Sequence, residues 1–189
     1  MSGRRWLSNL LLVCVCLLTA ACGQTEVERW ALGMPRVGAP APQFTLPAAD
    51  RSLLSLADLR GRRVVLYFYP QDGSPGCSLE AASFRDHLGT IDSLGATVVG
   101  VSVDSIASHE TFCQQLGLTF PLLSDSGGTV CRAYGTLASD GRAHRSTFVV
   151  DERGNIRAVF PVVKVQGHVE EVLRVLRAME PLRTGQGAP

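Results

Sequence analysis

Two apolar runs separated by a helical segment are the strongest constraint on how this chain can fold. The runs VVLYFYP (64–70) and ATVVGVSVD (96–104) are nearly continuous and rich in β-branched residues, as expected of strands buried on both faces of a sheet. Between them, residues 78–94 carry apolar side chains at helical spacing. The chain is therefore predicted to contain a β-α-β unit.

The rest of the chain adds helices and strands around this unit. Helices are predicted at 106–116, 129–134 and 169–179, a short strand at 120–125, and two strands within 146–163. Gly117 suits the C-terminal end of the first of these helices, and Arg153, Gly154 and Asn155 suit a turn between the last two strands. Parallel and hairpin-linked strands together indicate an α/β fold with a mixed central sheet flanked by helices on both faces. This order is compatible with a thioredoxin-like fold.

Composition narrows the function classes. With 189 residues, of which 46% are hydrophobic, the chain is long enough for one well-buried globular domain. Its formal net charge of +1 leaves no excess charge to attract nucleic acid. The four histidines lack cysteine or acidic partners at ligand spacing, so no metal site is predicted.

The first 22 residues have the layout of a secretory signal. Two arginines precede an apolar stretch at 10–18, which is shorter than the roughly 20 residues of a spanning helix, and small residues then lead to Cys22. The segment LTAACG (18–23) resembles a bacterial lipobox, in which the cysteine is lipidated and becomes the mature N-terminus, although Thr19 stands where leucine is preferred. We therefore expect an exported, membrane-anchored lipoprotein. Simple cleavage and an uncleaved anchor are the alternatives.

This interpretation divides the chain into four parts. Residues 1–22 are the signal ending at Cys22, 23–35 a flexible tether that contributes nothing to the core, 36–183 the folded domain, and 184–189 a loose tail. No aspartate follows Cys22, which favours the outer membrane in a cell that has one.

Cys77 is the residue at which the sequence concentrates chemistry. Pro75 and Gly76 form a turn directly before it, so its sulfur is expected in the first turn of a helix. There, unpaired backbone N–H groups and the positive end of the helix dipole favour a thiolate. The alternative is a buried structural cysteine, because cysteine is among the most buried residue types. Position alone leaves both interpretations open.

Pro70, Ser74 and Cys77 reproduce the P-x-x-x-T/S-x-x-C motif of peroxiredoxins. The longer stretch YFYPQDGSPGCSLEAASFRD (67–86) resembles the bacterioferritin-comigratory, or Q-type, branch of that family, and the likeness covers nearly the whole domain. The resemblance implies a thiol-dependent peroxidase in which Cys77 attacks the peroxide. It further implies that Ser74 hydrogen-bonds the peroxide, that Pro70 shields the sulfur, and that an arginine before a late strand, here Arg145, polarises both.

The resemblance also gives Glu80 a role, that of holding Arg145. Cleavage of the O–O bond requires a thiolate and hydrogen-bond donors for the leaving oxygen, and Ser74, the amides of Gly76 and Cys77, and the guanidinium of Arg145 are suitable donors. Without the motif, Arg145 would be interpreted as a solvated charge at a strand end. Glu80 would likewise be a carboxylate interacting with a helix dipole.

The second thiol of the catalytic cycle must come from elsewhere in the chain. Many Q-type members carry a resolving cysteine five residues after the first, but position 82 is alanine here. Other members place it on the next helix, where this chain has Cys113. The alternative for Cys113 is simple packing against the sheet. Cys131 matches no family role and is interpreted as a small apolar core residue.

The function expected is that of an atypical two-cysteine thiol peroxidase that reduces hydrogen peroxide and organic hydroperoxides. Cys113 would resolve the sulfenic acid as an intramolecular disulfide, and a thioredoxin-like or other dithiol would reduce it. The resemblance implies no metal, haem or flavin cofactor, and we expect a monomer or weak dimer.

Other interpretations remain open at this stage. They are a peroxidase that uses an external thiol in place of Cys113, a membrane-tethered thiol-disulfide oxidoreductase, a copper-delivery module and a non-catalytic binding domain. The oxidoreductase needs C-x-x-C and the copper module C-x-x-x-C, whereas Glu80 and Ala81 occupy the positions of the second cysteine.

Overall fold

The computed structural model describes residues 33–179. The expected signal, Cys22, most of the expected tether and the C-terminal tail therefore lie outside the described residues. Within 33–179, no helix has both the length and the apolar character needed to cross a bilayer.

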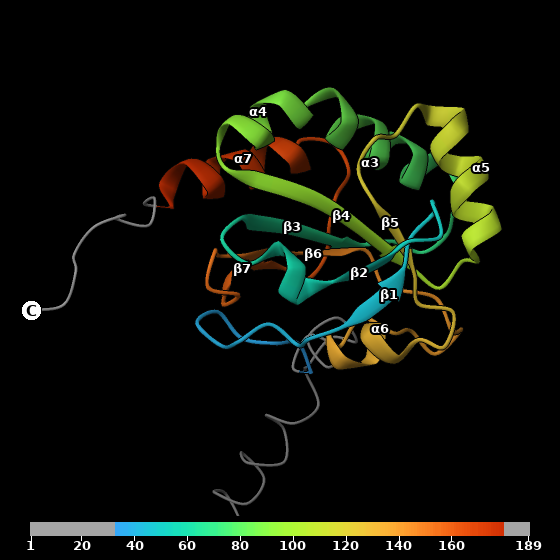
Figure 1. The fold of residues 1–189 in the computed structure, drawn as a ribbon, viewed down its shortest axis with the longest axis horizontal. Helices are drawn as coiled ribbons and strands as arrows, with labels where there is room; N and C mark the ends of the chain where they lie inside the picture. The colour runs from blue at the N-terminus through green and yellow to red at the C-terminus, as the bar shows by residue number, and fades with distance from the viewer. Residues whose placement is uncertain (1–32, 180–189) are drawn as a thin grey trace, which may run out of the picture.

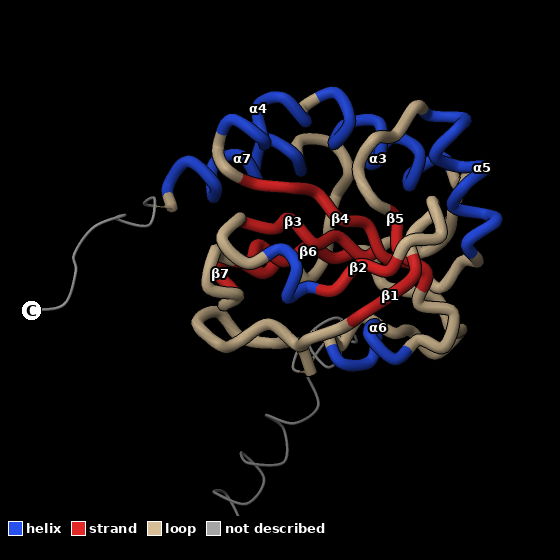
Figure 2. The backbone as a smooth tube through the Cα atoms, viewed as in Figure 1, coloured by secondary structure: helices blue, strands red, loops and turns tan. Residues whose placement is uncertain are grey.

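A five-stranded mixed sheet forms the centre of the domain (Figures 1 and 2). Its strands, in the spatial order β5-β4-β3-β6-β7, are β5 (Leu122–Ser124), β4 (Ala96–Ser102), β3 (Arg63–Phe68), β6 (Ser146–Val150) and β7 (Ile156–Phe160). Strands β3, β4 and β5 run parallel, whereas β6 is antiparallel to both β3 and β7. This confirms the β-α-β unit and the hairpin predicted from the sequence.

Helices cover the two faces of the sheet unequally. One face is covered by the helices α3 (Pro75–Asp86), α4 (Leu88–Ser93), α5 (Ile106–Leu116) and α7 (His168–Ala178) (Figure 1). The other face carries the short helix α6 (Thr129–Ala133) and a separate hairpin of β1 (Thr45–Pro47) and β2 (Leu53–Ser55), followed by the 3-10 helix η1 (Leu56–Leu59). The α/β fold with a mixed sheet and helices on both faces is confirmed.

Each face of the sheet builds its own apolar core. Along β3, Val64, Leu66 and Phe68 belong to the core beneath α6 and the β1–β2 hairpin. Their neighbours Val65 and Tyr67 belong to the core beneath α3, α4, α5 and α7. Because successive strand side chains point to opposite faces, a strand covered on both sides must be apolar throughout, as the run at 64–70 is.

The single helix predicted over 78–94 is two helices, of which the first, α3, starts three residues earlier than expected. Helix α3 begins at Pro75, and the chain leaves helical geometry at His87, where φ is −106° and ψ is 5°. The His87 ring nitrogen Nδ1 lies 2.8 Å from the Ser83 carbonyl oxygen, the atom that would accept the next helical backbone bond. The side chain thus competes with the backbone and separates α3 from α4.

The flexible tether was expected to extend to residue 35, but its last residues are part of the folded domain. Met34 is only 7% exposed and belongs to the core beneath α6. An added Cβ on Gly135, after α6, would lie 2.7 Å from the carbonyl carbon of Gly33. Residues 33–35 are therefore packed against the domain, which the local sequence did not indicate because a single methionine makes no periodic pattern.

Candidate active site

Cys77 lies in the first turn of α3, directly after the loop that leaves β3. Proline occupies the first position of α3, where its missing N–H costs no hydrogen bond. The earliest backbone bond of the helix runs from the Ser78 N–H to the Ser74 carbonyl at 2.9 Å. The N–H groups of Gly76 and Cys77 therefore precede the regular ladder and point out of the helix N-terminus. The Cys77 side chain is 1% exposed, so its sulfur is shielded from bulk water.

The structure brings Arg145 and Glu80 together with this thiol. Nη2 of Arg145 donates to Cys77 Sγ at 3.2 Å. Nη1 of the same guanidinium donates to Glu80 Oε2, which lies one helical turn after Cys77. A planar guanidinium can hold a carboxylate with one arm and present the other to the sulfur. Arg145 stands immediately before β6, so the central sheet places it over the start of α3.

Gly76 lets the guanidinium come this close. A Cβ at position 76 would lie 3.2 Å from Arg145 Nη2, which is tighter than an ordinary van der Waals contact. The absence of a side chain at this position thus leaves room for the arm of Arg145 that reaches Cys77 Sγ.

Burial and the partner's charge act in opposite directions on the pKa of Glu80 and on the pKa of Arg145. Burial raises the pKa of Glu80 to about 7 although the charge and hydrogen bond of Arg145 oppose it. Its second oxygen, Oε1, is buried without a hydrogen-bond partner among residues 33–179. Burial alone would lower the pKa of Arg145, but the charges of Glu80 and Cys77 outweigh it and raise that pKa, so the guanidinium stays charged.

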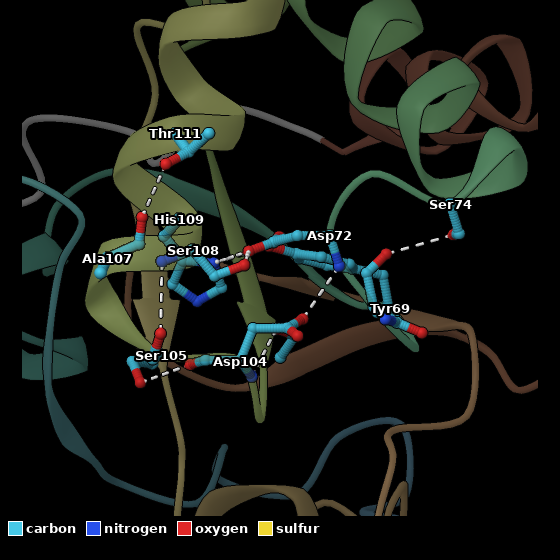
Figure 3. Close-up of polar contacts among 12 residues, drawn as sticks. Tyr69, Asp72, Ser74, Asp104, Ser105, Ala107, Ser108, His109 and Thr111 are labelled. Carbon is cyan, nitrogen blue, oxygen red and sulfur yellow. Dashed lines mark hydrogen bonds and ion pairs between the residues drawn. The ribbon is translucent and has the colours of Figure 1, made fainter.

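Ser74 and Pro70 lie in the loop that leads into the helix. Ser74 is the N-cap residue of α3, and its hydroxyl donates to the Gln71 carbonyl at 3.1 Å instead of capping the helix (Figure 3). That bond uses the hydroxyl hydrogen and leaves oxygen lone pairs available to accept. Pro70 follows β3 by two residues and is half-buried.

The three cysteines of the described chain are free thiols in different surroundings. Cys113 is half-buried on α5 and packs against the same core as Cys77. Burial, followed by the charges of Asp72 and Asp50, raises the pKa of Cys113 to about 11. Cys131 is fully buried in the core on the opposite face of the sheet.

Two features near the site were not predicted from the sequence. Asp72, in the loop before α3, is hydrogen-bonded to His109 on α5 at 2.8 Å. His168, at the start of α7, lies 2.8 Å from Thr147 Oγ1 on β6. Burial, then the charge of Arg145, lowers the pKa of His168 to about 4, so this ring is neutral at pH 7. Nothing in the local sequence distinguishes either histidine, because their partners lie far away along the chain.

Comparison with known proteins agrees with this geometry. A sequence model of the AhpC/TSA family matches residues 37–159. The protein named bcp of Coxiella burnetii is 47% identical over 144 residues, which cover 72% of this chain and 95% of that protein.

Solved structures similar to this chain come from the same family. A mutant of PrxQ from Xylella fastidiosa has a TM-score of 0.72 and 36% identity, covering 76% of this chain and 96% of that one. The bacterioferritin comigratory protein of Xanthomonas campestris, described for its alkyl peroxide reduction activity, has a TM-score of 0.71 and 32% identity, covering 76% of this chain and 98% of that one.

A thioredoxin-like α/β domain with a buried, arginine-bound cysteine at a helix N-terminus defines the class of thiol-dependent peroxidases. The chain belongs to the AhpC/TSA family, in its Bcp and peroxiredoxin Q branch.

Proposed function

We propose that Cys77 reduces hydrogen peroxide and organic hydroperoxides. The observation that carries this proposal is the 3.2 Å hydrogen bond from Arg145 Nη2 to Cys77 Sγ at the N-terminus of α3. The sulfur attacks one peroxide oxygen, the O–O bond breaks, and the other oxygen leaves as water or an alcohol after it takes up a proton. Cys77 becomes a sulfenic acid. The alkyl peroxide activity described for the Xanthomonas campestris relative supports the inclusion of organic hydroperoxides.

The hydrogen-bond donors around Cys77 suit both the attack by the sulfur and the departure of the second oxygen. The guanidinium of Arg145 and the amides of Gly76 and Cys77 stabilise negative charge on the sulfur and on the oxygen that leaves. Ser74 offers a hydroxyl to the peroxide, and Pro70 helps to keep water from the sulfur. Glu80 keeps the guanidinium in place.

We assign the resolving step to Cys113. Its thiol condenses with the sulfenic acid of Cys77, a disulfide forms and one water leaves. Cys113 and Cys77 are free thiols on two different helices that pack into one core, so they lie on the same face of the sheet. Cys131 lies on the other face, which argues against it as the partner. A thioredoxin-like or other dithiol then reduces the disulfide, and the enzyme works as a monomer or weak dimer.

The location proposed for this activity is the outside of the cell membrane. Cys22, in the lipobox-like segment, would carry the lipid, and the residues between it and Gly33 would connect the lipid to the packed domain. The donor of electrons would then be an extracytoplasmic dithiol.

Peroxide consumption by the purified domain, with dithiothreitol as reductant, tests the proposal. Cys77→Ser is expected to abolish turnover, whereas Cys131→Ala keeps it. After one equivalent of peroxide, mass spectrometry is expected to show a Cys77–Cys113 link. A lasting sulfenic acid on Cys77 of the wild-type protein would instead favour a peroxidase that depends on an external thiol.

A further inference from the structure

Helix α5, which carries Cys113, is only lightly anchored to the domain. Of its eleven residues, only His109 and Phe112 are buried. A cavity of about 470 Å³ lies between α5 and the β1–β2 turn, and Cys113, Ala49 and Phe120 are among its lining residues. Segments with few buried apolar contacts open at low free-energy cost, so α5 is a segment that can unwind locally.

One of the two anchors, His109, is held by a carboxylate in the loop that leads to Cys77. His109 Nδ1 lies 2.8 Å from Asp72 Oδ2, and Ser108 Oγ donates to the same oxygen at 2.7 Å (Figure 3). Because a carboxylate only accepts, Nδ1 carries the hydrogen. The His109 side chain is 0% exposed and that of Asp72 is 6% exposed, so the hydrogen bond is shielded from water.

Asp72 is held in place by residues just after β3 and β4. Its Oδ1 accepts from the Tyr69 hydroxyl at 2.8 Å, and its backbone N–H donates to Asp104 Oδ2 at 2.9 Å. Burial would raise the pKa of Asp72, but hydrogen bonds from His109, Ser108 and Tyr69 together with the charge of His109 outweigh it and lower that pKa. The carboxylate is therefore ionised at neutral pH, when its hydrogen bonds are strongest.

Each residue of this pair lies close in sequence to one of the two thiols. Asp72 lies five residues before Cys77 in the loop between β3 and α3. His109 precedes Cys113 by four residues, which places both on one side of α5. Unwinding of α5 around Cys113 would therefore have to break the buried bond between His109 and Asp72.

We propose that Asp72 and His109 are positioning residues that hold α5 closed while Cys77 reacts, and so set how fast Cys113 resolves the sulfenic acid. This inference rests on the proposed role of Cys113. Burial and the charges of Asp72 and Asp50, which raise the pKa of Cys113, also keep its thiol protonated in the closed helix. Release of His109 frees α5 to bring Cys113 to Cys77.

The timing of this release decides between two reactions of the sulfenic acid. In the first, Cys113 condenses with it, one S–S bond forms and water leaves. In the second, another peroxide oxidises it to sulfinic acid, one peroxide oxygen is transferred to sulfur and the other leaves as water or alcohol. A longer closed time favours the second reaction.

The test compares His109→Leu with His109→Asn and with Thr111→Ala. Leucine removes the hydrogen bond to Asp72, whereas the asparagine amide can donate from the place of Nδ1. Thr111 lies on the exposed side of α5 and loses only its bond to the Ala107 carbonyl. Peroxide competition measures Cys77 oxidation, and rapid acid quenching with mass spectrometry measures the Cys77–Cys113 disulfide and the sulfinic acid separately.

In His109→Leu, disulfide formation is expected to accelerate about tenfold, as loss of a buried hydrogen bond to a charged group predicts. The sulfinic acid yield falls in proportion, whereas Cys77 oxidation stays within about two-fold because His109 does not touch the sulfur. His109→Asn and Thr111→Ala should behave like the wild type. Unchanged disulfide formation in His109→Leu overturns the inference.

Two further results separate this inference from the proposed function. If the wild-type protein forms no Cys77–Cys113 link, the assignment of Cys113 fails and the inference fails with it. If the link forms but its rate of formation is the same in the wild type and in His109→Leu, only the inference fails. Should His109→Leu not fold, Ser108→Ala removes another hydrogen bond to Asp72 and must speed disulfide formation severalfold for the inference to stand.

Discussion

At the scale of single residues, the guanidinium of Arg145 is shared between the Cys77 thiol and the Glu80 carboxylate. One arm reaches the sulfur and the other is held one helical turn away, so its orientation depends on both partners. A lysine at this position would place a single charge on a flexible stem and could not present two fixed donors.

Replacement of Arg145 by methionine is expected to slow peroxide reduction about 100-fold or more, because a preorganised donor at the reacting atoms is lost. Arg142→Met, on the exposed loop before Arg145, serves as the control. Peroxide reduction at the wild-type rate in Arg145→Met would mean that the hydrogen bond to Cys77 Sγ does not contribute to the reaction.

Gly76→Ala is expected to reduce activity without reducing stability. The new Cβ would lie 3.2 Å from Arg145 Nη2 and push the guanidinium aside. We expect a loss of roughly 3- to 10-fold in peroxide reduction from this small displacement. Helix propensity works the other way, because alanine is favoured over glycine by about 0.5–1 kcal/mol in a helix.

Gly89→Ala in α4 is the matched control for that variant. A Cβ there would meet no other atom within 4 Å. Both variants should gain stability in urea unfolding, but only Gly76→Ala should lose activity. Equal activity in the two variants would contradict the close approach of Arg145.

Glu80→Gln is expected to remove part of the pH dependence of stability. The pKa of Glu80 rises from its ordinary value of 4.5 to about 7 on folding, because burial disfavours the charge. Between these values the folded protein keeps a proton that the unfolded chain has lost, so stability falls as pH rises. The wild type should thus lose on the order of 3 kcal/mol that the variant keeps.

Urea unfolding at pH 5 and pH 8 measures this difference. Other groups, including His168 with its lowered pKa, titrate in both proteins and cancel in the comparison. Parallel pH dependence in wild type and Glu80→Gln would mean that folding does not raise the pKa of Glu80.

At the scale of elements, the pairing of β3 with β4 controls the ring that packs beneath α3. Tyr67 stands opposite Gly100 in this parallel pair. Its ring stacks on Tyr69 and contacts Phe84 of α3 at a centroid distance of 4.9 Å. Glycine on the neighbouring strand leaves the space that the Tyr67 ring fills.

Gly100→Ala should therefore destabilise the domain. A Cβ at this position would lie 2.6 Å from Leu122 Cδ2 and 2.8 Å from Tyr67 Cζ, well inside contact distance. Overpacking of this kind costs about 1–3 kcal/mol, to be measured by urea unfolding against Gly89→Ala. A stability equal to that of the wild type would show that Tyr67 and Leu122 can move aside freely.

At the scale of the whole molecule, the proposed location of the enzyme depends on lipidation of Cys22. If Cys22 carries a lipid, the full-length protein should fractionate with membranes while Cys22→Ala does not, and the two full-length proteins should have equal peroxidase activity. Membrane extraction and mass spectrometry of the N-terminal peptide measure this. A soluble full-length protein with unmodified Cys22 would leave a secreted or otherwise unanchored enzyme.

Element by element, the sequence predicted most of the sheet. The strands at 64–70 and 96–104 could be found because a strand buried on both faces must be apolar throughout. Helix α5 was predicted with its observed bounds, since Ile106 follows an N-cap serine and Gly117 closes the helix at φ 61°. The break at His87 and the β1–β2 hairpin were not predicted, because each depends on a few residues without a repeating pattern.

The sequence by itself determined the class of the fold and the nucleophile, since alternation of buried strands with helices and a motif around Cys77 are local in the chain. The resemblance named Arg145 and Glu80 as partners of that nucleophile, but only the tertiary structure shows how they meet it and adds the bond between Asp72 and His109. Arg145 lies 68 residues from Cys77, and the Asp72–His109 bond joins residues 37 positions apart. Such contacts arise from how the sheet orders its strands and how helices pack over it, and burial in that packing then shifts the pKa of Glu80 and of Cys113.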